Sequence, residues 1–81
     1  MGKSYFDRLE YLDFLIRTKS TGTPQHLAKK IGTSLRTVYD YLDLLKSLGA
    51  PIDYSKDRLT YYYAEEGHFE FHFKRLKQDN Q

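Results

Sequence analysis

The chain has 81 residues, a formal net charge of +2 and no cysteine. This length is near the lower limit for folding on one hydrophobic core, so we expect a single small domain. The absence of cysteine excludes disulfides and thiolate metal sites. The sequence contains no run of about 18 apolar residues that could span a bilayer and no signal-peptide pattern. We therefore expect an intracellular protein without a membrane partner.

The positive charge is unevenly distributed along the chain. Residues 74–81 hold three of the 13 basic residues and one of the 11 acids, which leaves residues 1–73 with ten of each sign. Between Asp13 and Asp40 there is no acid, whereas five basic residues fall there: Arg17, Lys19, Lys29, Lys30 and Arg36. A basic stretch of this kind is suited to a polyanion. The alternative is a solvated face of two helices.

A first helix is expected from Tyr5 to about Thr18, with Ser4 as its N-cap. Apolar residues at helical spacing would form its buried stripe: Tyr5, Leu9, Leu12 and Ile16. The helix also carries Tyr11, Phe14 and Leu15 on other faces, which is more apolar surface than one partner helix usually covers. We expect another part of the chain or a second subunit to pack there.

Residues 23–49 predict two helices joined by a short turn. Thr23 can cap a helix at Pro24–Ile31 that Gly32 ends, and Ser34 can cap a longer helix that continues through Leu48. A short helix, a glycine-containing turn and a longer helix form the helix-turn-helix arrangement, whose second helix enters the DNA major groove. The expected core residues of this pair are Leu27, Ala28, Ile31, Val38, Leu42 and Leu45, with Leu35 at the edge of the stripe.

The outward face at the start of the longer helix is polar. At about 100° per residue it contains Ser34, Arg36, Thr37, Tyr39 and Asp40. These side chains form hydrogen bonds, as base and phosphate contacts require.

After residue 49 the pattern changes to that of strands. The β-prone runs 51–54 and 59–63 flank a polar loop at residues 55–58, which predicts a hairpin. Lys56 and Arg58 would lie at its tip.

Residues 68–73 alternate strictly and predict a further strand with Phe69, Phe71 and Phe73 on one face. These phenylalanines are expected to be core or dimer residues, because they would cover the first helix within the chain or pair with a second subunit. His68 and His72 would share the other face, about 13 Å apart at a rise of about 3.3 Å per residue, so no metal site is expected.

Three helices followed by a hairpin with a basic tip form the α+β winged helix-turn-helix architecture: a three-helix bundle plus a β-hairpin wing, here with an extra C-terminal strand. We expect this domain to cover residues 1–73 and a flexible polar tail to cover residues 74–81. Residues 27–39, followed by Leu42, Leu45, 48–49 and 51–52, resemble the N-terminal DNA-binding domains of DeoR-like and WYL-domain regulators. They are also similar to the DNA-binding domain of the biotin repressor.

The resemblance covers about residues 5–63, and residues 34–39 are its most specific part. It implies phosphate contacts near the starts of the second and third helices, base or phosphate contacts by Arg36, and a wing along a neighbouring groove or backbone. The residues expected at the interface with double-stranded DNA are Thr23, Gln25, His26, Ser34, Leu35, Arg36, Thr37, Tyr39, Asp40, Lys56 and Arg58.

Two features depart from this family pattern. The chain has Asp40–Tyr41 where such regulators commonly carry Arg-Asp, and we expect none of its residues to serve as the large effector domain that such regulators attach. A carboxylate on the DNA-facing side can accept a hydrogen bond from cytosine N4, but it is repulsive close to phosphate.

We therefore expect a small stand-alone transcriptional regulator of the bacterial cytoplasm or nucleoid, which binds DNA as a homodimer because two half-sites give a small helix-turn-helix protein affinity and specificity. We expect no enzymatic activity, cofactor, metal or small-molecule ligand. The alternative is a winged-helix protein-interaction module, for dimerisation or as an adaptor, that does not bind DNA.

Overall fold

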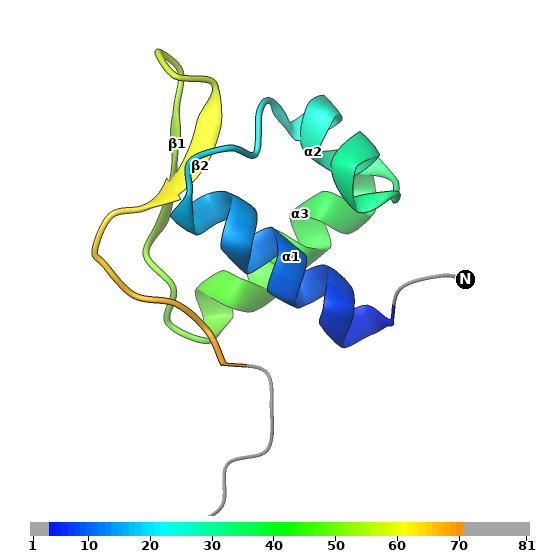
Figure 1. The fold of residues 1–81 in the computed structure, drawn as a ribbon, viewed down its shortest axis with the longest axis horizontal. Coiled ribbons are helices and arrows are strands. Elements are labelled where there is room, and N and C mark those ends of the chain that lie inside the picture. Colours follow the sequence, from blue (N-terminus) through cyan, green and yellow to red (C-terminus); the bar gives the residue numbers. More distant parts are fainter. Residues whose placement is uncertain (1–3, 71–81) are drawn as a thin grey trace, which may run out of the picture.

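The computed structural model describes residues 4–70, which form three α-helices followed by an antiparallel β-hairpin (Figure 1). This arrangement confirms the expected α+β winged helix-turn-helix fold. The elements in chain order are α1 (Tyr5–Arg17), α2 (Pro24–Ile31), α3 (Leu35–Ser47), β1 (Ile52–Ser55) and β2 (Thr60–Tyr63).

The helices begin at the residues that the sequence predicts, and α1 and α3 each end one residue earlier than expected, with Thr18 and Leu48 as their C-caps. Ser4 caps α1 in a capping box with Asp7, and the hydroxyls of Thr23 and Ser34 cap α2 and α3. Gly32 ends α2 in the left-handed conformation, with φ at 83°. Residues 32–34 alone therefore end one helix and start the next, which is what makes α2 and α3 a helix-turn-helix pair.

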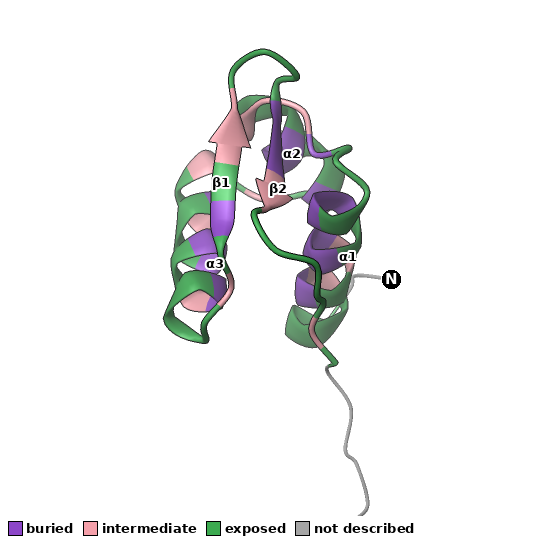
Figure 2. Cartoon of the chain, turned by 90° about the vertical axis from the view of Figure 1, so that its left-hand side faces the viewer, coloured by how far each residue is buried: buried purple, intermediate pink, exposed green. Residues whose placement is uncertain are grey.

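The core lies where the three helices meet the hairpin (Figure 2). The six core residues expected on α2 and α3 are all buried, and so are Leu9, Leu12 and Ile16 of α1. The expectation for Tyr5 was wrong, since 49% of its surface is exposed. Tyr5 lies in the first turn of α1, at the edge of the core, where its ring contacts Tyr41 edge to face.

Leu15 was expected on a separate face of α1, yet only 4% of its surface is exposed. The reason is that β2 packs against α1 and extends the buried surface around the helix. Part of the excess apolar surface of α1 is thus covered from within the chain. Phe6 and Phe14 stay exposed.

The hairpin loop spans residues 56–59, one residue later than expected, because Ser55 still pairs with Thr60 across the two strands. The Ser55 hydroxyl accepts the Arg58 N–H at 3.1 Å, and its carbonyl accepts the Leu59 N–H at 2.8 Å. Leu59 adopts φ of 55° to close this turn. Lys56 and Arg58 remain exposed at the tip.

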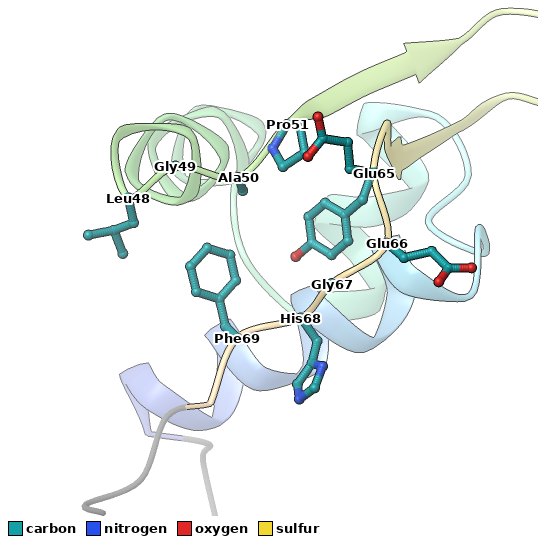
Figure 3. Close-up of a pocket in the computed structure, with 10 residues that line it drawn as sticks. Leu48, Gly49, Ala50, Pro51, Glu65, Glu66, Gly67, His68 and Phe69 are labelled. Carbon is teal, nitrogen blue, oxygen red and sulfur yellow. The ribbon is translucent and has the colours of Figure 1, made fainter.

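After β2 the chain runs back beside α1 (Figures 2 and 3). Residues 68–70 lie in no strand, so the extra strand is not found in the part of the chain that the structure describes. The Phe69 N–H donates to Asp13 Oδ1 at 3.3 Å, which ties this segment to a helix side chain and not to a strand edge. Phe69 is half-buried against the core of its own chain. Phe71, His72, Phe73 and residues 74–81 lie outside the described residues.

Candidate nucleic-acid interface

The first half of α3 presents a polar face to solvent, as the helical period predicts. Arg36 and Asp40 are exposed, and 45% of the Tyr39 surface is exposed. Leu35 is half-buried at the edge of the core stripe. This face therefore combines a cation, a phenol and a carboxylate within the first two turns of the helix.

Ser34 and Thr37 form a pair of hydroxyls at the start of α3. The Ser34 oxygen accepts the Thr37 N–H at 3.1 Å, and the Ser34 hydroxyl donates to Thr37 Oγ1 at 3.0 Å. A hydroxyl has one hydrogen and two lone pairs, so the Thr37 hydrogen can still be donated to a ligand. The pair is suited to an acceptor such as a phosphate oxygen.

The start of α2 carries the other polar group expected at the interface. Thr23 Oγ1 accepts the His26 N–H at 3.3 Å and lies 3.0 Å from His26 Nδ1. The imidazole is thereby held against the cap, while Gln25 and His26 stay exposed. The first N–H groups of a helix lack internal partners and carry partial positive charge, which favours a phosphate here.

Two tyrosines of the wing pack together, and one of them interacts electrostatically with a tyrosine of α3. Tyr54 and Tyr61 pack edge to face with ring centroids 4.8 Å apart. Burial raises the pKa of Tyr61, and the nearby phenols of Tyr39 and Tyr54 raise it further. Tyr39 of α3 thus lies near enough to Tyr61 of β2 to affect the pKa of its phenol.

Asp13 is a buried residue whose role the sequence analysis missed. Only 3% of its surface is exposed, and its carboxylate accepts from Arg17 Nε at 3.1 Å and from the Tyr63 hydroxyl at 2.6 Å. Burial, followed by this hydrogen bond, raises the pKa of Tyr63 well above its ordinary value. The position of Asp13, four residues after Leu9, is the signal in the sequence that it lies beside the buried stripe. Its contacts fix β2, and with it the wing, against α1.

A hollow of about 300 Å³ lies between the end of α3 and the segment after β2 (Figure 3). Leu48, Ala50 and Phe69 line its apolar side, and Glu65 and Glu66 its polar side. None of the residues expected to contact DNA lines it. It is thus separate from the candidate interface.

Within residues 4–70, no group of three or more His, Cys, Asp or Glu side chains is arranged to hold a metal ion. His68 Nε2 lies 3.7 Å from the Glu70 carboxylate. No helix in the same range is long and apolar enough to cross a membrane.

The fold and the polar start of α3 together define a helix-turn-helix protein, a class that binds DNA. The chain belongs to the helix-turn-helix (HTH) domain family, whose model matches residues 8–63. This match extends from α1 to the end of β2. No curated protein and no solved structure matches the chain.

Proposed function

We propose that the protein binds double-stranded DNA with the start of α3 in the major groove and acts in transcriptional regulation. The observation that carries the proposal is the exposed cluster of Arg36, Tyr39 and Asp40 on the first turns of α3, in a domain of the helix-turn-helix family. The resemblance of residues 34–39 to DeoR-like and WYL-domain regulators and to the biotin repressor supports the same role.

The proposed DNA contacts are of two kinds, to base edges and to the phosphate backbone. Arg36 is the candidate for base recognition, because a guanidinium can donate two parallel hydrogen bonds to the O6 and N7 atoms of guanine. Phosphate contacts are assigned to the hydroxyls at the start of α3 and to the first turn of α2. Lys56 and Arg58 of the wing would follow a neighbouring groove or backbone.

The regulator would act as a homodimer in the bacterial cytoplasm or nucleoid, because two half-sites give a small helix-turn-helix domain more affinity and selectivity. Tyr5, Phe6 and Phe14 leave exposed aromatic surface on α1 that a second copy could cover. Phe71 and Phe73 are proposed to contribute to the same contact or to the core. No catalytic role or small-molecule ligand is part of the proposal.

The test is a selection of bound fragments from random duplex DNA, followed by affinity measurements for Arg36→Ala on the selected sequence and on an unrelated one. A good bidentate contact is worth about 1–3 kcal/mol of discrimination, so the variant should lose selectivity by roughly 5- to 150-fold. Lys46→Ala, in the last turn of α3, is the matched control. Unchanged affinity and selectivity in the Arg36 variant would overturn the residue assignment.

A second candidate function is a protein-interaction module that has lost DNA binding. The exposed carboxylates of Asp40 and Asp43 on the outward face of α3 favour it, because they repel phosphate. Non-specific binding is strongest at low salt, so failure to bind any duplex there would select this alternative.

A further inference from the structure

Another hollow lies between the wing and the turn that joins α1 to α2. It is open to solvent, has a volume of about 190 Å³ and is lined by Lys19, Ser55, Arg58, Thr60 and Tyr62. Every one of these side chains can donate a hydrogen bond, and none is acidic. Ser55 pairs with Thr60 across the hairpin, and Tyr62 follows two residues later, so these three share one face of the wing.

Both cations of this hollow are available to a ligand. Lys19 and Arg58 are exposed, and neither forms an ion pair within residues 4–70. Lys19 comes from the turn after α1 and Arg58 from the wing, so the fold brings together two charges from distant parts of the chain.

Four carboxylates lie near the hollow without lining it. Asp57 precedes Arg58 in the loop, and Asp53 pairs with Tyr62 across the strands. Lys19 also borders a neighbouring hollow that contains Glu65 and Glu66, but it forms no ion pair with either of them. The lining itself therefore carries two positive charges and no negative one.

The neutral side chains of Ser55 and Tyr62 add hydrogen-bond donors, which suit an anion with several oxygen acceptors. Ser55 Oγ accepts the Arg58 N–H at 3.1 Å, which leaves the serine hydrogen free to be donated. The Tyr62 phenol adds another donor. A water molecule occupies about 30 Å³ in the liquid. The hollow of about 190 Å³ therefore has room for several water-sized groups, and so for a phosphate group.

The two loops that border the hollow each contain a non-glycine residue in the left-handed backbone conformation. Lys19 and Leu59, with φ of 56° and 55°, are the only non-glycine residues with positive φ in the described part of the chain, and they lie in the two loops that border the hollow. Strained conformations of this kind persist where the surroundings hold them, and they are frequent at binding sites. Hydrogen bonds between Thr21, in the turn after α1, and Thr60, the first residue of β2 after the hairpin loop, hold the two segments together here.

We propose that this hollow binds a phosphate group of the DNA backbone, with Lys19 and Arg58 neutralising its charge and Ser55 and Tyr62 donating hydrogen bonds. The inference rests on the proposed function. In Figure 1 the wing, the turn after α1 and the start of α2 follow one another along the same edge of the molecule. A DNA strand that passes the start of α2 on its way to the wing tip therefore passes the hollow.

The test compares the salt dependence of duplex binding for the full chain, Lys19→Gln and Arg58→Gln. Each phosphate contact contributes a slope of about −0.9 to the plot of log affinity against log salt, so each variant should have a slope shallower by about that amount. Between 50 and 200 mM salt, each variant should then lose about three- to fourfold less affinity than the parent. Sequence preference should not change, because backbone contacts carry no base information.

Lys46→Gln is the matched control, since Lys46 is exposed in the last turn of α3 and does not line the hollow. It should keep the parental slope, and thermal unfolding of all variants checks that each one folds. A parent that binds duplex while both variants keep its slope would overturn the phosphate site alone. A parent that binds no duplex at low salt would overturn both this inference and the proposed function.

A titration with inorganic phosphate, followed by NMR at the Lys19 and Tyr62 amides, separates backbone phosphate from a free anion. We expect weak perturbation of these signals that Lys19→Gln abolishes, together with the altered salt slopes. Tight perturbation by phosphate with unchanged slopes would assign the hollow to a free anion and overturn the DNA assignment.

Discussion

Thr21 and Thr60 are buried side by side, with their hydroxyl oxygens 3.0 Å apart although 39 positions separate them in the sequence. The Thr21 N–H donates to Thr60 Oγ1 at 3.1 Å, and the Tyr61 N–H donates to Thr21 Oγ1 at 2.9 Å. The turn after α1 thus satisfies the backbone of β2 on the side away from β1. These bonds hold the wing in a fixed position relative to the helices.

Replacement of either threonine by valine should destabilise the fold. Thr60→Val leaves the buried Thr21 N–H without its acceptor, and Thr21→Val does the same to the Tyr61 N–H. A buried polar group that loses its partner costs about 1–3 kcal/mol. Because the two side chains share one network, the double variant should lose less than the sum of the single losses. Urea denaturation measures all three, and strictly additive losses would contradict a shared network.

The Asp13–Tyr63 pair should make stability depend on alkaline pH. The folded state raises the pKa of Tyr63 above the ordinary value of 10.0, through burial and its hydrogen bond to Asp13. Above pH 10 the unfolded chain releases the phenol proton while the folded chain retains it, so the folded state binds more protons. The free energy of unfolding should therefore be fully retained below pH 10 and fall as the pH rises above it.

Tyr63→Phe removes this titration, so its stability should decline less than that of the parent when urea denaturation is repeated from pH 8 to pH 11. At pH 8 the variant should be less stable by about 1.5–3 kcal/mol, because it lacks a hydrogen bond to a charged group. Tyr62→Phe is the control, since Tyr62 lies on the other face of the wing. Parallel declines in Tyr63→Phe and the parent would exclude the Asp13 pair as the source.

Local signals were enough to predict the helices and the exposed polar face of α3. Ser4, Thr23 and Ser34 cap the helices that they precede, and Gly32 ends α2, because capping acts over only a few residues. The same holds for the exposed face of α3, which follows from the helical period alone.

Contacts between distant segments could not be predicted from these signals. Thr21 reads as a loop residue and Thr60 as a strand residue, and only the packed fold brings them together. Lys19 likewise reads as a solvated lysine in the sequence. Only the packed fold places it in the same hollow as Arg58 of the wing. The exposure of Tyr5 was also missed: its spacing matches the buried stripe, but it is the first residue of α1 and lies at the edge of the core, where it contacts Tyr41.

Gly22 and Gly32 offer a comparison of two left-handed glycines, with φ of 76° and 83°. Alanine at Gly32 meets no atom within 4 Å, so Gly32→Ala should cost only the about 1–2 kcal/mol of the left-handed backbone. At Gly22 a Cβ would also lie 2.9 Å from His26 Cβ, in the first turn of α2. Gly22→Ala should therefore be the more destabilising of the two in thermal unfolding. Equal losses would show that the first turn of α2 shifts without cost.

Asp40 is the carboxylate on the face proposed to enter the major groove. Two unit charges about 4 Å apart interact by about 1 kcal/mol even in bulk water, so a carboxylate close to phosphate weakens binding about fivefold. Asp40→Asn should therefore raise the affinity for duplexes of unrelated sequence several-fold. If Asp40 also accepts from cytosine N4 in the selected site, the preference for cytosine at one position should fall.

Fluorescence anisotropy with an unrelated and a selected duplex measures both effects. Glu10→Gln on α1 is the charge-matched control, because Glu10 is exposed but lies outside the proposed interface. It should change affinity less than Asp40→Asn at the same salt concentration. Equal affinities for parent and Asp40→Asn on both duplexes would place this turn of α3 away from the DNA, and the base-reading face would then have to end at Arg36.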